Sequence, residues 1–168
     1  MTFSSSSFSD DCVFIAERLP PRVIGNPWQL VFTTETDGFS LNNIYRKADG
    51  LKRNSPTLIA IKDDEDCCFG ALVSDNLSVR GKFYGTGESF LWRTKPDRQH
   101  WKWSTKNSYF LSCSRQCINI GAGDGHFGLS LDSDLNHGRT EACDTFDNDA
   151  LTARGDFVVK TVEIWSFQ

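Results

Sequence analysis

The feature that most constrains the fold of this chain is a long series of short apolar or alternating segments separated by turn residues. The turns recur about every 8 to 12 residues, and no strand–helix–strand rhythm is present. This pattern favours antiparallel pairing over a parallel sheet. We therefore predict an α+β fold that is mainly β, a two-sheet antiparallel β-sandwich flanked by two or three short helices. The predicted strands are residues 28–33, 57–61, 67–73, 82–84, 89–92, 101–103, 109–111, 118–120, 127–131 and 157–167.

The start of the chain divides into a Ser-rich stretch and a helix. Residues 1–9 are rich in Ser and are expected to be a disordered tail. They lack the basic start and apolar region of a secretory signal, so no signal peptide is expected. Residues 10–18 are predicted to form a short helix, which Pro20 and Pro21 end. The remaining length suits one domain, so residues 10–168 are predicted to form a single unit.

A second helix is predicted at residues 41–48. Its apolar residues recur at i, i+3, i+4 and i+7 from Leu41, which is the spacing of one helix face. Ser40 precedes the helix as an N-cap, and Gly50 lies where a left-handed terminator is expected. Residues 63–66 form an acidic turn between two apolar segments, so these segments are predicted to make a hairpin.

The charge and cysteine content exclude some classes of protein. The formal net charge is −4, whereas a general nucleic-acid binder normally carries a basic face. No apolar run approaches the roughly 20 residues of a membrane span. The six cysteines occur without a secretory signal, which favours free thiols in a reducing compartment. We therefore expect a monomeric cytoplasmic protein with no nucleic-acid partner and no membrane span.

A glycine-rich stretch precedes the predicted strand at residues 127–131. Gly123, Gly125 and Gly128 have the spacing of dinucleotide and kinase glycine loops. A dinucleotide site needs a helix after the glycines, but here a strand follows. The other kinase motifs are missing as well. We interpret these glycines as a structural motif that allows a tight turn and close approach of the backbone.

A second glycine motif surrounds Glu88. Gly85 and Gly87 flank a short segment, which suggests a bulge or a backbone crossing. Glu88 is either a catalytic acid or, in the interpretation we prefer, a buried carboxylate that accepts backbone hydrogen bonds. The alternating Trp101 and Trp103 have the residue type of a sugar or nucleic-acid platform, but one buried face of a strand explains them more simply.

A polar loop follows the strand at residues 127–131 and carries the candidate functional surface. Asp132, Asp134 and Asn136 imitate the start of an EF-hand loop, but the later Gly and bidentate Glu that such a loop needs are absent. The Cys and His spacing also lacks a zinc motif. We predict no metal and no cofactor, and we interpret these side chains as hydrogen-bonding groups that shape the loop. The candidate interaction or loop-shaping surface comprises Asp124, Asp132, Asp134, Asn136, His137, Arg139 and Glu141.

Cys143 is the candidate redox thiol of this loop. Arg139 and His137 precede it, and a cationic neighbour would lower the pKa of the thiol and favour the reactive thiolate. Oxidation would give a sulfenic acid, from which cysteine can be recovered. The alternative is a small buried side chain that anchors the loop through Phe146. The sequence leaves both interpretations open.

Motifs spread over roughly residues 17–168 resemble those of a known family. In chain order they are Pro27-Trp28-x-Leu30, Gly38-x-Ser40-Leu41-x-x-x-Tyr45, Phe69-Gly70-Ala71, Tyr84-Gly-Thr-Gly-Glu-x-Phe90-Leu91, Gly125-x-Phe127-Gly-Leu129, Leu131-Asp-x-Asp-Leu-x-His-Gly-Arg139, Cys143-x-Thr-Phe146 and Glu163-Ile-Trp165-x-Phe167. Together they resemble the TLDc domain, whose family includes the oxidation resistance proteins. The resemblance implies a two-sheet antiparallel sandwich, protection from oxidative stress and binding to the vacuolar proton-pumping ATPase. It supplies no set of catalytic residues.

Two functions are therefore expected from different classes. The first is a non-catalytic interaction domain that protects against oxidative stress by binding and regulating subunits of the vacuolar proton-pumping ATPase. The alternative is a thiol-based antioxidant enzyme that uses Cys143, and a carbohydrate-binding sandwich is a distant third. We expect binding rather than catalysis. The expected location is cytoplasmic, with recruitment to organelle membranes through the pump. Mitochondrial and nuclear pools are alternative locations.

Overall fold

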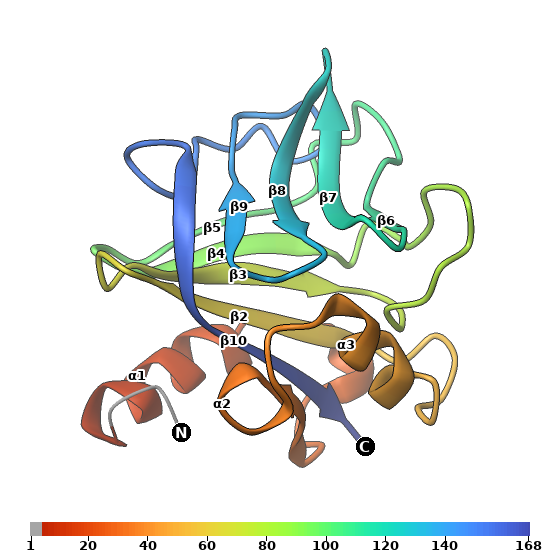
Figure 1. Ribbon diagram of the computed structural model, residues 1–168, viewed down its shortest axis with the longest axis vertical. Coiled ribbons are helices and arrows are strands. Elements are labelled where there is room, and N and C mark those ends of the chain that lie inside the picture. The colour runs from red at the N-terminus through yellow and green to blue at the C-terminus, as the bar shows by residue number, and fades with distance from the viewer. Residues whose placement is uncertain (1–4) are drawn as a thin grey trace.

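The computed structural model describes the backbone from residue 5 and the side chains from residue 10, in both cases to residue 168. It contains a large antiparallel sheet and a few short helices (Figure 1). The predicted mainly β fold class is thereby confirmed. The strands are β1 (Trp28–Thr33), β2 (Thr57–Asp63), β3 (Cys68–Val73), β4 (Phe90–Lys95), β5 (Gln99–Trp101), β6 (Leu111–Cys113), β7 (Cys117–Gly123), β8 (His126–Asp132), β9 (His137–Arg139) and β10 (Asp156–Phe167).

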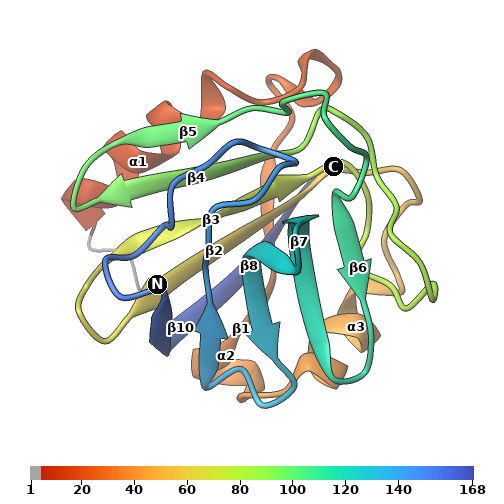
Figure 2. The same ribbon diagram turned by 90° about the horizontal axis from the view of Figure 1, so that it is seen from above.

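Strand β10 connects the two halves of the sheet. Its first residues pair with β9, and from Val159 onward it pairs with β2, while β1 pairs with its final residues on the other side. The register shifts between Val159 and Thr161, which is the mark of a bulge. The order across the sheet is β5-β4-β3-β2-β10-β9-β8-β7-β6. The two halves turn toward each other (Figures 1 and 2), as in the expected sandwich, but β10 makes them one continuous sheet.

A shared hydrophobic core lies between the two halves. Phe69 of β3 meets Phe157 of β10 edge to face, with ring centroids 4.8 Å apart. Leu129 and Leu131 of β8 are buried in this core, as predicted, whereas Phe127 is only half-buried. A second cluster covers the other face of β2, β3 and β4, where helix α1 (Ser5–Ala16) lies (Figure 1). Because both faces of β2 and β3 are covered, these strands have continuous apolar sequences.

Helix α1 begins earlier than predicted. It starts at Ser5 rather than at residue 10, and it ends at Ala16. The part of the expected tail at residues 1–4 lies outside the described residues. None of the helices in residues 5–168 is long and apolar enough to span a membrane.

Helix α3 (Leu41–Ala48) has the predicted bounds. The Oγ of Ser40 accepts a hydrogen bond from the amide of Asn43 at 3.4 Å, so Ser40 is the N-cap. Gly50 does not adopt the expected left-handed conformation. The helix ends instead where the amide of Asp49 donates to the Tyr45 carbonyl. Helix α2 (Thr34–Asp37) and the short 3-10 turn η1 (Pro21–Val23) were not predicted.

Two strand predictions need correction, and one strand was not predicted. The expected strand at residues 82–84 is reduced to an isolated bridge between Tyr84 and Leu111. The flanking Gly81 and Gly85 both have positive φ, which interrupts an extended backbone. Strand β5 ends at Trp101, so Trp103 is 36% exposed instead of buried. Strand β9 was missed because it is only three residues long within a polar segment.

Candidate functional site

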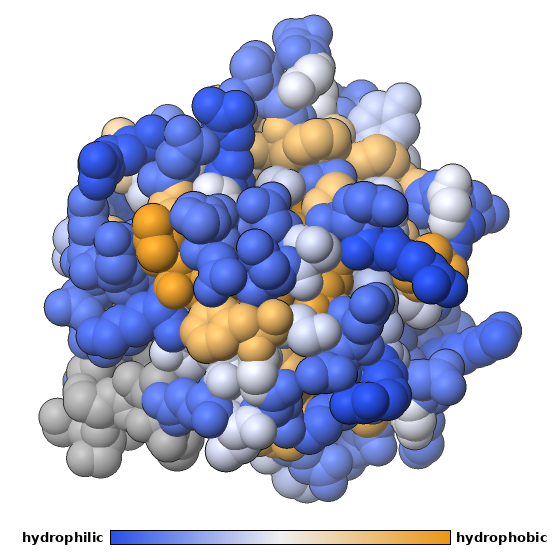
Figure 3. Space-filling model, viewed as in Figure 1, coloured by the Kyte–Doolittle hydropathy of each residue, from blue (hydrophilic) through white to orange (hydrophobic). Residues whose placement is uncertain are grey.

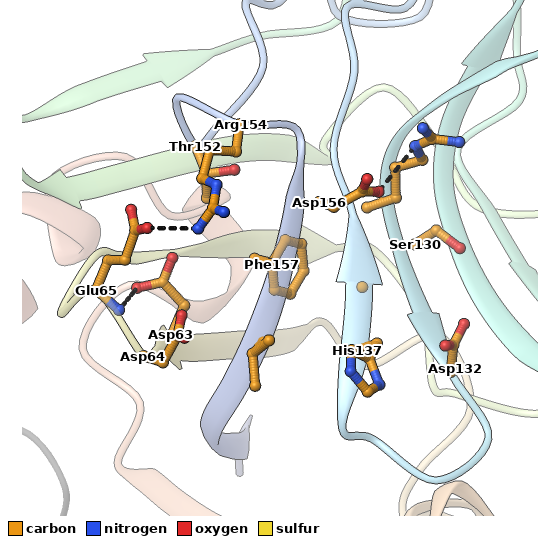
Figure 4. A pocket seen from close by; sticks show the side chains of 13 residues that line it. Asp63, Asp64, Glu65, Ser130, Asp132, His137, Thr152, Arg154, Asp156 and Phe157 are labelled. Atoms are coloured by element: carbon orange, nitrogen blue, oxygen red, sulfur yellow. Dashed lines mark hydrogen bonds and ion pairs between the residues drawn. The ribbon is translucent and has the colours of Figure 1, made fainter.

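A cleft of about 620 Å³ lies between the β2–β3 turn and strands β8, β9 and β10. Figure 4 shows three separate chain segments meeting there: the acidic turn after β2, the residues around β9, and the loop that leads into β10. The candidate residues Asp132, His137 and Arg139 are among those that line it. Regular strands hold these side chains, because β9 pairs with β8 on one side and β10 on the other.

The cleft is polar and mostly acidic. The five carboxylates that line it are those of Asp63, Asp64, Glu65, Asp132 and Asp156. The guanidinium groups are those of Arg139 and Arg154. The face that carries β8, β9 and β10 is largely hydrophilic in Figure 3, with small separate apolar areas. This face is therefore better suited to recognition through polar contacts than to recognition through a large apolar patch.

Ion pairs join the segments around the cleft. Arg139 Nε lies 3.1 Å from Asp156 Oδ1 and 3.2 Å from Glu141 Oε1. Arg154 Nη1 lies 3.0 Å from Glu65 Oε1 across the mouth of the cleft. These side chains are largely exposed, so each pair contributes little to stability. They place opposite charges side by side on the surface around the cleft.

Asp63 is the buried carboxylate of this cleft. Its Oδ1 accepts hydrogen bonds from the amides of Glu65 at 3.0 Å and Cys67 at 2.8 Å. Burial raises the pKa of Asp63, although these amide bonds oppose the shift. The carboxylate therefore shapes the acidic turn at some cost in free energy when it is charged.

We predict that Asp63→Asn is at least as stable as the wild type at pH 7, because an amide oxygen accepts the same two bonds without a buried charge. The raised pKa of Asp63 means that the folded state binds more protons than the unfolded state. Lowering the pH toward 4 therefore stabilises the wild type relative to the variant. Urea unfolding at several pH values measures this difference. Asp63→Ala is the control and should lose about 2 kcal/mol, since both amide bonds disappear. A variant that is destabilised equally at every pH would contradict the prediction.

Asp132, Asp134 and His137 lie close enough together to be tested as metal ligands. Their ligand atoms all lie within 4.8 Å of one another, and all three residues are exposed. Asp134 Oδ1 accepts a hydrogen bond from the amide of Asn136 at 3.1 Å, so Asp134 shapes the turn as expected for an Asx motif. Exposed acidic groups of this kind are common without a metal.

The glycine stretch lies at the β7–β8 hairpin rather than in the cleft. Asp124 and Gly125 form its two-residue loop, with φ values of 51° and 78°. Positive φ at both positions is the geometry of a type I′ turn, for which Asp-Gly is a preferred sequence. Gly128 lies within β8, where a Cβ would come 3.0 Å from the Ile120 carbonyl oxygen. Glu141 contacts His126 near this hairpin.

Gly123 and Gly121 bring the hairpin close to the loop that contains Cys143. A Cβ at Gly123 would come 2.7 Å from Asp144, and one at Gly121 would come 2.8 Å from Cys143 Sγ and from the Phe146 ring. These contacts leave no room for side chains larger than hydrogen. The glycines therefore fix the position of the 143–146 segment against β7.

Cys143 lacks the features of an activated thiol. It is buried, and its Sγ lies 3.2 Å from Asn148 Oδ1. Burial raises the pKa of this thiol, which is the opposite of the lowering that activation by Arg139 and His137 would cause. Those two side chains line the cleft instead. The geometry agrees with the anchoring interpretation of Cys143.

Glu88 is placed differently from the preferred sequence interpretation. It is half-exposed, and both of its carboxylate oxygens accept hydrogen bonds from Arg22, at 3.0 to 3.2 Å. The preferred interpretation of a buried carboxylate bound by backbone amides is therefore wrong. Arg22 also donates to the carbonyls of Asn54 and Ser74. Sequence reasoning missed Arg22, which lies 66 residues from Glu88.

The second glycine motif packs tightly around an aromatic ring. Gly87 lies against Trp103, where a Cβ would come 2.2 Å from the ring. Gly85 has a φ of 105° and lies beside Phe110. These glycines allow the backbone of the 85–89 turn to pass close to Trp103 and Phe110, in agreement with the predicted backbone crossing.

Comparison with known proteins identifies the family. The TLDc domain model matches residues 3–168. The chain is 44% identical to nuclear receptor coactivator 7 of Mus musculus over 154 residues, which is 92% of this chain and 16% of that protein. It is 42% identical to oxidation resistance protein 1 of Homo sapiens over 154 residues, 92% of this chain and 17% of that protein. The same protein from Xenopus tropicalis is 42% identical over 165 residues, 98% of this chain and 19% of the relative.

The chain thus spans less than a fifth of the length of these relatives, but the match extends over nearly all of its own described fold. The resemblance seen in the motifs and the match over residues 3–168 agree with each other. This chain belongs to the TLDc domain family.

Proposed function

We propose that this chain is a non-catalytic interaction domain that protects cells against oxidative damage by binding and regulating the vacuolar proton-pumping ATPase. The relatives named oxidation resistance protein 1 support the protective role. The pump is the partner implied by the resemblance to the TLDc family. In this proposal the domain acts as a cytoplasmic monomer, needs no cofactor and reaches organelle membranes through the pump.

The observation that carries this proposal is the charged cleft held by β8, β9 and β10. Its side chains form a polar surface on regular strands, with ion pairs between several of them. A docking surface needs a fixed pattern of charge and shape. An acid–base catalyst would instead need groups whose pKa values are shifted toward the working pH. Asp63 is shifted in the cleft, but its carboxylate is occupied by two backbone amides.

The thiol-based alternative retains one supporting observation. Cys143 is among the residues that line an open groove of about 260 Å³, together with His126 and Asp144. A peroxide could therefore approach this part of the loop. Against it, the raised pKa of Cys143 lowers the fraction of reactive thiolate at neutral pH. We therefore place the enzyme second to the interaction domain.

The deciding experiment compares charge reversal in the polar segment with removal of the thiol. We predict that the double variant Asp134→Lys with Arg139→Glu binds the purified pump about tenfold more weakly, because exposed attractions become repulsions. Cells that carry this variant should also lose survival in peroxide. Cys143→Ser should keep both pump binding and protection. Biosensor affinity and survival counts measure the two outcomes.

The matched control is Lys52→Glu with Asp49→Lys. These charges lie on a loop outside the cleft, and like the test pair they leave the net charge unchanged. Thermal unfolding should show that all variants are folded. If Cys143→Ser folds normally but abolishes protection, while the charge reversals keep protection and pump binding, the interaction proposal is wrong and the redox enzyme replaces it.

A further inference from the structure

A second charged region lies far along the sheet, at its β5 edge. Residues 78–109 contain seven Lys or Arg and two acidic residues, a formal net charge of +5, although the whole chain has a net charge of −4. Within this segment Arg98, His100 and Lys102 alternate along β5 and its two flanking positions. Alternate residues of a strand point to the same face. One face of β5 is therefore lined by basic side chains.

Two adjoining hollows follow this face of β5. One, of about 640 Å³, is lined by residues that include Arg18, His100, Lys102 and Trp103. The other, of about 350 Å³, is lined by Phe14 and Arg98 among others. Both hollows include Glu17, so they adjoin each other near the end of α1 and the β5 edge, and we call the two together the groove. The groove is separate from the acidic cleft described above.

The contacts in this groove hold its basic groups in place. Arg18 Nε donates to His100 Nδ1 at 3.2 Å, and the guanidinium lies 3.8 Å from the centroid of the Phe14 ring. Burial and the neighbouring Arg18 and Lys102 lower the pKa of His100, so the ring is neutral at pH 7. Since its Nδ1 accepts from Arg18, its Nε2 carries the proton and is a donor.

The carboxylates in the groove are partly neutralised. Glu88 is bound by Arg22, as described above, and Glu17 lies 3.6 Å from Arg18. Arg98 is 3.9 Å from the buried Asp11. Lys102 is exposed, and no ion pair to it is found among the described residues. Asp10 also lines the hollow that contains Arg98. The groove therefore carries three carboxylates and three cationic side chains, and its row of donors is the one formed by Arg98, His100 and Lys102 along β5.

The backbone of β5 offers a second means of recognition. Strand β5 pairs with β4, and in the described part of the chain no strand pairs with its other side. In an antiparallel pair, successive residues direct their amide and carbonyl groups to alternate sides. Some of these groups of β5 are therefore directed outward, where an extended peptide can add as a new strand.

We propose that the β5 edge and its groove bind an extended acidic peptide of a partner protein, with carboxylates at every second position. Such a strand would place its carboxylates opposite Arg98, His100 and Lys102, at the separation of cross-strand neighbours. Its backbone would pair with the outer side of β5. The intervening side chains would face away from α1.

The observations favour a peptide over the other polyanions. Nucleic acid and anionic membranes present dense, continuous negative charge, which Glu17 and Glu88 in the groove would repel. A peptide carries its carboxylates at spaced positions and also has backbone groups that match a free strand edge. The groove is also a concave feature beside an edge, and a membrane surface would contact it poorly.

The test measures fluorescence anisotropy of a labelled peptide that alternates Glu and Val over about six residues. We expect the wild type to bind it and Arg98→Glu with Lys102→Glu to bind it about tenfold more weakly. The control is Lys52→Glu with Arg53→Glu, which changes the net charge equally at exposed positions outside the groove. This control should bind like the wild type.

Further probes need only the wild-type protein. The same peptide with alternate backbone amides methylated cannot pair with a strand edge, so it should bind at least about tenfold more weakly. Equal binding of the methylated peptide would overturn strand addition. Tighter binding of phosphatidylserine vesicles or of a single-stranded oligoadenylate than of the peptide would overturn the choice of partner. Absence of any peptide binding by the wild type would overturn the proposal altogether.

Discussion

Gly70→Ala is expected to lower the free energy of unfolding by about 4 kcal/mol or more. A Cβ at Gly70 would lie 1.8 Å from the carbonyl oxygen of Ile59 and 3.1 Å from the Trp92 ring. The first contact is with backbone of the central strand β2, so a change of rotamer cannot relieve it. The strands would have to separate, and the pairing of β2 with β3 would be lost locally.

Urea unfolding followed by tryptophan fluorescence measures this loss, or poor recovery of folded protein reveals it. The matched control is Gly50→Ala, because Gly50 has no atoms near its Cβ position and no positive φ. That variant should change stability by less than about 1 kcal/mol. A Gly70→Ala protein as stable as this control would show that the two strands are not so closely packed.

Phe69→Ala is expected to cost about 3 to 5 kcal/mol. Phe69 is fully buried, and its ring meets that of Phe157 at 4.8 Å, with an angle of 79° between the ring planes. Phe69 belongs to β3 and Phe157 to the part of β10 that pairs with β9. The substitution therefore leaves a cavity where the two halves of the sheet face each other, directly behind the acidic cleft.

Calorimetric or urea unfolding measures the cost, with Phe39→Ala as the control. Phe39 is 42% exposed, so its removal should cost less than about 1 kcal/mol. A double variant with Phe157→Ala should show a coupling energy of about 0.5 to 1.5 kcal/mol between the two rings. Equal losses for Phe69 and Phe39 would contradict the structure of this core.

Local signals in the sequence were sufficient for several elements. The β2–β3 hairpin was predicted from two apolar segments around an acidic turn, since its partners adjoin in sequence. Helix α3 was predicted with its bounds from the Ser40 cap and one apolar face. The Asp124-Gly125 turn likewise depends on nearest neighbours alone. In each case the residues that determine the structure lie within about one hairpin of one another.

Elements that depend on distant partners were not predictable. Strand β9 exists because it pairs with β8 on one side and β10 on the other, and its three residues have no apolar alternation. Glu88 was misjudged because its partner Arg22 comes from η1. The pKa of Cys143 depends on burial, which sequence neighbours do not reveal.

The candidate site was likewise predictable only where local sequence determines it. The sequence placed Asp132, His137 and Arg139 in one functional segment, and the structure brings these three to one cleft. Nothing in the sequence indicated that the acidic turn after β2 and the loop before β10 complete that cleft. Those segments meet only because β10 crosses from one half of the sheet to the other. A polar segment can therefore be predicted from sequence, but the surface it joins is set by topology.

The position of β10 has a consequence for how the chain acquires its fold during synthesis. β10 follows β1, β2 and β9 in the chain, and all three pair with it. A ribosome therefore releases these strands before their common neighbour exists. Until β10 emerges, β1 has no described strand to pair with, and β2 and β9 expose unpaired edges. Such edges invite pairing with other chains. The nascent domain is thus most exposed to misassembly and to chaperone capture just before its last strand is made.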